Sequence, residues 1–259
     1  MADNRRWTVV TGASSGIGVE LARVFAARGS SLVLVARRRE RMEALAAELR
    51  DRNIAIEIMA LDLQDTAAPA ALMRALDSLG IVTHTLVNNA GFGLRGQFAT
   101  LPYDEQVGMV ELNVMALTKL CRMALPGLIE RRAGGILNLA STAAFQAGPN
   151  MAVYYATKAF VLSLSEALHE EAKPHGVTVT ALCPGPVPTE FQARADMKMT
   201  RALELAAIPA AEVARIGVEG YEAGKAIVIP GLANRFGAWG AQHIVPRFLT
   251  RKIAGKVQA

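Results

Sequence analysis

The sequence lacks several features that would assign it to a specialised class of protein. It has only two cysteines, Cys121 and Cys183, without metal-ligand spacing or a histidine partner pattern, so we expect reduced, inert thiols and no metal site. No apolar run reaches the roughly 18 residues that span a membrane, and the amino terminus offers no charged patch followed by a hydrophobic stretch. Neither secretion nor membrane spanning is indicated, and the expected location is the cytoplasm.

The excess of positive charge is also small, at 28 lysines and arginines against 23 acidic residues. The basic residues do not alternate with aromatic residues in the manner typical of a nucleic-acid reader. We therefore predict no nucleic-acid partner, and an anionic cofactor would account for the excess.

Strand-like runs alternate with amphipathic helical stretches along the whole chain. After a first strand before Gly12, strands are expected at 31–35, 54–60, 84–87, 134–140, 177–182 and 225–229. The runs SLVLV, VTVTAL and AIVIP are apolar nearly throughout, as expected for parallel strands covered on both sides. This pattern predicts an α/β fold: a Rossmann-like doubly wound parallel sheet of about seven strands with helices on both faces. No linker or repeat interrupts it, so we expect a single domain with its body at 1–230 and a basic amphipathic extension at 231–259.

A glycine turn lies between the first expected strand and the first expected helix, in the segment TVVTGASSGIGVELARVF. Gly12, Gly16 and Gly18 allow close approach of a ligand, and the helix offers its free N–H groups and positive dipole end to a phosphate. A dinucleotide pyrophosphate fits this description. The spacing G-x-x-x-G-x-G differs from G-x-G-x-x-G, however, so an ordinary strand-to-helix turn is the alternative.

Tyr154 and Lys158 are four residues apart in a stretch with helical apolar spacing, which puts a phenol and an ammonium on one face. Free tyrosine titrates near pH 10, and a nearby cation lowers that pKa by stabilising the phenolate. The pair is therefore a candidate proton donor. Tyr155, three residues before Lys158, satisfies helix geometry as well.

Several motifs now combine in order: TGASSGIG at 11–18, NNAG at 88–91, Asn113, Ser141 thirteen residues before Tyr154, and CPGPVPTE at 183–190. With them the chain resembles the short-chain dehydrogenase/reductases from residue 7 to about 230. It looks closest to the NADPH-using ketone and ketoacyl reductases, which share an arginine-rich segment like ARRRERMEALAAEL.

This resemblance implies hydride transfer between a nicotinamide and a carbonyl or alcohol carbon. In it, Tyr154 exchanges the proton on the oxygen, Ser141 hydrogen-bonds that oxygen, Lys158 lowers the tyrosine pKa and holds the nicotinamide ribose, and Asn113 anchors a water leading to solvent. The family spacing selects Tyr154 over Tyr155. Taken individually, Ser141 could merely cap a strand end and Asn113 could be an ordinary helix residue.

The cofactor choice depends on the end of the second strand, Ala36-Arg37-Arg38. An NAD enzyme usually has an acidic residue there for the ribose 2′-hydroxyl, whereas a guanidinium grips a 2′-phosphate. We therefore predict NADP over NAD, with Arg37 on the phosphate and Ser14 as a second contact. Arg39 and Arg41 are interpreted as the solvated face of the next helix.

Further cofactor contacts follow from the resemblance only. Asp62 and Leu63 are expected at the adenine, and Asn88 and Ala90 at the ribose. Ser15, Ile17 and Gly91 are further expected contacts. At the nicotinamide amide we expect Pro184, Gly185, Val187 and Thr189.

The segment 190–209 is expected to close over the substrate. It contains Phe191, Met197, Met199, Leu203, Leu205 and Ile208. These residues predict an apolar pocket for a hydrophobic ketone, secondary alcohol or 3-oxoacyl carbonyl, although they would serve equally to pack a helix on the body. The alternatives for the whole chain are an alcohol dehydrogenase with the same site and an NADP-binding sensor or scaffold without catalysis.

The tail at 231–257 predicts two helices separated at Pro246. Leu232, Phe236, Trp239, Phe248, Leu249 and Ile253 would form apolar faces, and Arg235, Arg247, Arg251, Lys252 and Lys256 a basic one. Packing on the body or a partner is the main interpretation, and contact with an anionic membrane the alternative. By analogy with the family, the helices near 104–125 and 152–170 are candidate contacts of a homodimer or homotetramer.

Overall fold

The computed structural model describes residues 5–195, 201–243 and 246–257. Its seven strands are all parallel, in the order β3-β2-β1-β4-β5-β6-β7. They are β1 Trp7–Thr11, β2 Ser31–Ala36, β3 Ile56–Ala60, β4 Thr83–Asn88, β5 Gly135–Leu139, β6 Thr178–Leu182 and β7 Ile227–Val228. The predicted Rossmann-like doubly wound sheet is confirmed, and each expected strand is present within about two residues of its predicted bounds.

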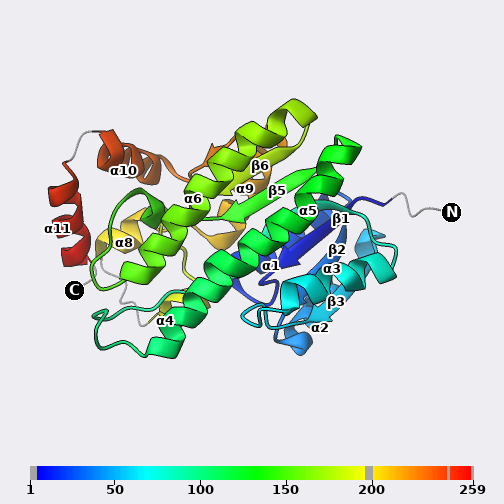
Figure 1. Ribbon diagram of the computed structural model, residues 1–259, viewed down its shortest axis with the longest axis horizontal. Helices are drawn as coiled ribbons and strands as arrows, with labels where there is room; N and C mark the ends of the chain where they lie inside the picture. Colours follow the sequence, from blue (N-terminus) through cyan, green and yellow to red (C-terminus); the bar gives the residue numbers. More distant parts are fainter. Residues whose placement is uncertain (1–4, 196–200, 244–245, 258–259) are drawn as a thin grey trace.

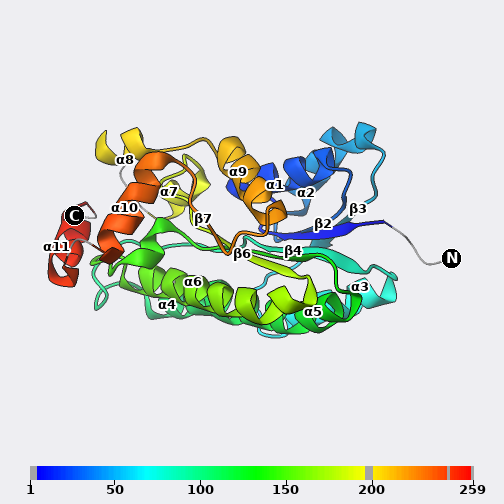
Figure 2. The ribbon, with the colours of Figure 1, turned by 90° about the horizontal axis from the view of Figure 1, so that it is seen from above.

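Helices cover both faces of the sheet (Figures 1 and 2). On one face lie α1 Gly16–Ala27, α2 Arg39–Glu48 and α9 Ala210–Glu222; on the other lie α3 Ala68–Ser78, α4 Tyr103–Val110, α5 Leu117–Arg131 and α6 Ala152–Ala172. The helices α7 Glu190–Arg194, α8 Arg201–Ala206, α10 Leu232–His243 and α11 Arg247–Val257 gather at the end of the sheet opposite the amino terminus (Figure 2). Since β1 runs away from the amino terminus, this is the carboxyl end of the parallel strands.

Alternation along each strand divides the core into two layers. Val9, Val33, Leu86 and Ile136 point to the α3, α5 and α6 side, and their strand neighbours point to the α1, α2 and α9 side. Because both faces are buried, the strands read as continuous apolar runs. The same two-sided burial explains why their positions were predictable from sequence.

One helical stretch, Tyr103–Arg131, is long and apolar enough to cross a membrane by length and composition alone. Its second half, α5, instead packs on β4 and β5, with Leu120 and Leu128 almost completely buried in the core. Residues Glu111–Ala116 in the middle form a π-helical segment, a local change of hydrogen bonding that frequently marks functional sites. Asn113 lies within it.

Candidate active site

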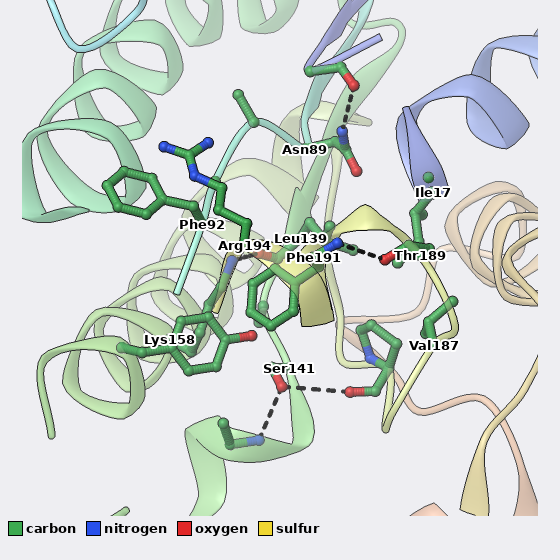
Figure 3. A pocket seen from close by; sticks show the side chains of 18 of the residues that line it. Ile17, Asn89, Phe92, Leu139, Ser141, Lys158, Val187, Thr189, Phe191 and Arg194 are labelled. Carbon is green, nitrogen blue, oxygen red and sulfur yellow. Dashed lines mark hydrogen bonds between the residues drawn. The ribbon is translucent and has the colours of Figure 1, made fainter. Parts of the chain in front are cut away.

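A cavity of about 740 Å³ opens at the carboxyl ends of the strands, beside the point between β1 and β4 where the strand order reverses. Ligands of open α/β sheets bind at such a point. Figure 3 shows part of its lining. Most of the predicted site residues line it: Gly12, Ser14, Ser15, Gly16, Ile17, Arg37, Asp62, Leu63, Ala90, Gly91, Ser141, Tyr154, Lys158, Pro184, Gly185, Val187 and Thr189. Gly18, Asn88 and Asn113 are not part of this lining.

The glycine turn is shaped for close backbone approach. Gly12 has a φ of +68°, which favours glycine, and a Cβ there would come within 2.6 Å of the Asn89 amide nitrogen. A Cβ on Gly18 would lie 2.2 Å from the Gly12 carbonyl oxygen, so Gly18 allows α1 to pack on the turn. The turn therefore fits a dinucleotide pyrophosphate, with Gly18 acting through packing and not as part of the cavity wall.

The Asn88 side chain lies outside the cavity lining, and the ribose contact predicted for this residue stays a prediction. Its side chain is buried below the sheet edge and donates to Asn138 Oδ1 at 2.9 Å and to Cys121 Sγ at 3.3 Å, away from the predicted ribose contact. The next residue, Asn89, lines the cavity and donates to the Thr11 carbonyl at 2.9 Å (Figure 3). Successive strand residues face opposite sides, so the side chain expected at the cofactor is that of Asn89.

Asn113 is buried outside the cavity lining. It is 1% exposed, and its Oδ1 accepts a hydrogen bond from the Phe92 N–H at 3.1 Å. Its Nδ2 donates to the Phe92 carbonyl at 2.9 Å and to the Thr157 hydroxyl at 3.1 Å. These bonds fix the loop after β4 against α6. Asn113 is therefore a positioning residue for the cavity wall; its predicted water contact stays a prediction.

Tyr154 and Lys158 lie on the same face of α6, as helix spacing predicts. The Lys158 Nζ is 5.9 Å from the Tyr154 ring centroid and donates to the Leu139 carbonyl at the end of β5, at 2.7 Å. Ser141, directly after β5, accepts from the Ala143 N–H at 3.1 Å and donates to the Pro184 carbonyl at 3.5 Å (Figure 3). Three polar groups from β5 and α6 thus share one wall of the cavity.

The titration of this pair differs from the prediction that Lys158 lowers the phenol pKa. Burial raises the pKa of Tyr154 to about 12, with the Ser141 hydrogen bond acting in the opposite direction and Tyr155 adding to the rise. Burial also lowers the pKa of Lys158 to about 8. In this geometry desolvation outweighs the Ser141 hydrogen bond, so Tyr154 keeps its proton at neutral pH.

Tyr155 also lines the cavity, with its ring in an edge contact 6.1 Å from that of Tyr154. The Ser141 side chain, however, acts on the pKa of Tyr154, and the Lys158 ammonium lies over the Tyr154 ring. These contacts support Tyr154 as the proton donor.

Arg38 contacts Ser14, which is predicted to bind a 2′-phosphate together with Arg37. Its guanidinium donates to the Ser14 hydroxyl and carbonyl, each at 3.3 Å, while Arg37 pairs with Asp62 at 3.7 Å. Both arginines line the cavity. Arg39 and Arg41 are both exposed, as interpreted, and they pair with Glu43 at 3.7 Å and with Glu190 at 3.3 Å.

The segment expected to cover the substrate begins with α7, whose Thr189 forms a capping box with Gln192. Phe191 on this helix lines the cavity, 5.3 Å from the Tyr154 ring. Leu205 is 81% exposed, and Ile208 packs on the body. Met197 and Met199, and the side chain of Leu203, lie outside the described residues.

The tail contributes to the site, which the sequence reasoning missed. Ala233, Gly237 and Ala241 on α10 line the cavity, as does Asn234 next to Gly185. The only sequence signal was this repeat of small residues every four positions. Leu232, Phe236 and Trp239 on the other side of α10 are 69%, 70% and 54% exposed, so the body covers them only in part. The side chains of Arg247, Phe248, Ile253 and Lys256 lie outside the described part of the chain.

The two cysteines are both buried, and burial raises the pKa of each thiol to about 12. Thiols with such a pKa stay protonated and unreactive at neutral pH. Cys121 belongs to the polar network of Asn88 and Asn138 below the site.

Comparison with known sequences gives a family. The model of the family described as short chain dehydrogenase matches residues 6–200. A very-long-chain 3-oxoacyl-CoA reductase of Phaeosphaeria nodorum is 34% identical over 180 residues, 67% of this chain and 52% of that protein. A sulfoacetaldehyde reductase of Chromohalobacter salexigens is 41% identical over 184 residues, 70% of this chain and 72% of that protein. The match thus spans about half the length of the first relative.

Solved structures agree in fold. A short-chain dehydrogenase from Sphingobium yanoikuyae in complex with NADPH has a TM-score of 0.81 at 36% identity, covering 90% of this chain and 92% of that one. A bulky-bulky ketone specific alcohol dehydrogenase from Comamonas testosteroni gives 0.77 at 32%, covering 92% and 91%. A short-chain dehydrogenase/reductase from Burkholderia phymatum in complex with NAD gives 0.80 at 26%, covering 92% and 93%.

Proposed function

The chain belongs to the short-chain dehydrogenase/reductase family and is a dehydrogenase/reductase acting on CH–OH and C=O groups, and from this we propose that it reduces a carbonyl compound with NADPH. The observation that carries this proposal is the arrangement of Ser141, Tyr154 and Lys158 on one wall of the cavity. Burial keeps the Tyr154 phenol protonated at neutral pH, and the neutral phenol is the form that can donate a proton to a carbonyl oxygen.

Each residue has a separate task in this reaction. The Ser141 hydroxyl, beside the phenol, donates to the carbonyl oxygen and holds it for Tyr154, which gives that oxygen a proton as negative charge develops. Lys158 holds the nicotinamide ribose and supplies positive charge below its pKa of about 8. The reduced nicotinamide, when bound, supplies the hydride. The Leu139 carbonyl holds the Lys158 ammonium in place, and Asn113 holds the loop after β4.

The choice of NADP over NAD is supported by positive charge at the end of β2. Arg37 and Arg38 line the cavity, and Arg38 already contacts Ser14 in the glycine turn. A 2′-phosphate would meet two guanidinium groups and a hydroxyl there. Similar structures hold either NADPH or NAD, so the arginines, and not the fold, support this choice.

For the substrate we propose a hydrophobic ketone or a 3-oxoacyl-type carbonyl compound. Phe92, Met151 and Phe191 give the cavity an apolar wall next to Tyr154. The related proteins include reductases of very-long-chain 3-oxoacyl-CoA and of sulfoacetaldehyde, which differ greatly in the group attached to the carbonyl.

The test is a panel of ketones, 3-oxoacyl thioesters, aldehydes and the matching alcohols, followed by the absorbance of the reduced nicotinamide at neutral pH. We expect NADPH oxidation with at least one carbonyl compound. Faster oxidation of the alcohols would favour the alternative, an alcohol dehydrogenase with the same residues. NADPH binding without turnover of any compound would favour a sensor or scaffold.

We also propose that the chain forms a homodimer or homotetramer. Tyr103, Val107 and Val110 on α4 and Phe160 on α6 are exposed apolar side chains on the predicted contact helices.

The exposed face of α10 is a second candidate contact, either with a partner subunit or with an anionic membrane. Light scattering tests assembly. Flotation with anionic liposomes, comparing the chain with Phe236→Ser/Trp239→Ser, tests the membrane, and equal flotation of both would exclude it.

A further inference from the structure

Arg194, the last residue of α7, is a cation on the cavity wall that pairs with no acidic residue in the described part of the chain. Nearby cations have partners: Arg37 pairs with Asp62, and Arg38 and Arg41 pair with Glu190. The guanidinium carbon of Arg194 instead lies 3.9 Å from the centroid of the Phe92 ring (Figure 3). This cation–π contact positions the guanidinium but satisfies none of its N–H donors.

The electrostatic surroundings of Arg194 leave its charge only partly compensated. Burial lowers the pKa of this guanidinium, and the positive charges of Arg37 and Arg38 act in the same direction, against Glu105 and Asp62. A cation held in such a place is stabilised when an anion enters the cavity. The wall at Arg194 is therefore suited to a negatively charged group.

The position of Arg194 connects it to the reacting end of the cavity. Phe92 belongs to the same apolar cluster as Tyr154 and Met151. Phe191, one helical turn before Arg194, lies 5.3 Å from the Tyr154 ring. A molecule whose carbonyl oxygen meets Tyr154 and Ser141 would pass along these aromatic rings before it reaches the guanidinium.

We propose that Arg194 binds the negatively charged end of the substrate, so that the preferred substrates carry a carboxylate, sulfonate or phosphate separated from the carbonyl by an apolar stretch. A guanidinium binds each of these anions through two parallel hydrogen bonds. This inference rests on the proposed reductase function and narrows its substrate class.

The test compares an ω-oxo carboxylic acid with its methyl ester, which has almost the same shape and no charge. Arg194→Met keeps an unbranched apolar contact with Phe92 and removes the charge. Arg215→Met is the control, because Arg215 pairs with Glu219 on the outer side of α9 at 2.8 Å. We expect the unchanged chain to prefer the acid. Arg194→Met should lower kcat/KM for the acid by at least about tenfold, the loss expected when a hydrogen bond to a charged group is removed. The kcat/KM for the ester and the Kd of NADPH should stay unchanged.

Preference of the unchanged chain for the ester would overturn the proposal. So would an equal loss with both compounds, or a raised NADPH Kd in Arg194→Met, since the guanidinium would then serve the cofactor phosphates. If neither compound is turned over while NADPH binds, calorimetry of the acid with the NADPH complex decides, and equal affinity in both chains contradicts the proposal. Failure of the reductase function itself is separate: it would appear as absent turnover across the whole carbonyl panel.

Discussion

Glu190 and Arg38 form an ion pair of 2.9 Å across the cavity, joining the first residue of α7 to the residue before α2. The Glu190 carboxylate also pairs with Arg41 at 3.3 Å. The hydrogen bond from Arg38, the charges of Arg38 and Arg41, and the Ser15 hydroxyl keep the pKa of Glu190 below its ordinary value, so it is ionised at neutral pH. The Glu190 carboxylate of the protein thus occupies the Arg38 guanidinium that would bind a 2′-phosphate.

The first prediction concerns this competition. Glu190→Gln should lower the Kd of NADPH by about two- to fivefold, because an exposed ion pair is worth up to about 1 kcal/mol, and should leave the Kd of NADH unchanged. Titration by nicotinamide fluorescence measures both. Glu219→Gln, which breaks an Arg–Glu pair away from the cavity, is the control and should change neither. Weaker NADPH binding in Glu190→Gln would show that Glu190 closes over the bound cofactor.

The second prediction concerns the source of cofactor preference. Arg38→Ala should lower kcat/KM with NADPH by about 10- to 100-fold, as expected for charged hydrogen bonds of about 1.5–3 kcal/mol, with little effect on NADH. Arg37→Ala should act in the same direction, and Arg39→Ala, whose partner is Glu43, should be silent. A higher kcat/KM for NADH than for NADPH in the unchanged chain would contradict the choice of NADP.

The third prediction is that Asn113 stabilises the fold at the site. Asn113→Ala leaves the buried N–H and carbonyl of Phe92 without partners, at a cost of about 1–3 kcal/mol for each unsatisfied group. We expect a lower free energy of unfolding in urea and a lower kcat. Unchanged stability would mean that the loop after β4 is held by other contacts.

The fourth prediction is a pH dependence. Because the pKa of Lys158 is lowered to about 8 and that of Tyr154 is raised to about 12, rising pH removes the Lys158 charge first, while the phenol remains protonated. The kcat of carbonyl reduction should therefore fall as pH rises through about 8. A rate that stays constant up to pH 10 would show that the Lys158 charge is not needed.

The sequence predicted the framework well because its signals are local. Apolar runs located the strands, helix spacing placed Tyr154 and Lys158 on one face, and the glycine turn needed only its own backbone geometry. These features depend on residues close together in the chain, and two-sided burial of the sheet reinforces them.

The details of side-chain direction were less predictable. Asn88 and Asn89 are adjacent and identical, so only the register of β4 determines which one faces the cavity. The turn after β2 determines that Arg38 contacts Ser14 and that Arg37 pairs with Asp62. Arg194 and Phe92 are far apart in sequence, and the contact of α10 with the site is a tertiary one that no local pattern specifies.

The central claim is that the Tyr154 phenol is the proton donor of a carbonyl reduction. The most direct measurement is the NADPH-dependent reduction of a carbonyl substrate by Tyr154→Phe and Tyr155→Phe, with the NADPH Kd of each. Loss of general acid catalysis costs about 10²- to 10⁴-fold, so we predict such a loss of kcat in Tyr154→Phe, an unchanged Kd, and a mild effect in Tyr155→Phe. Retention of the full rate by Tyr154→Phe, or a severe loss in Tyr155→Phe alone, would contradict the account.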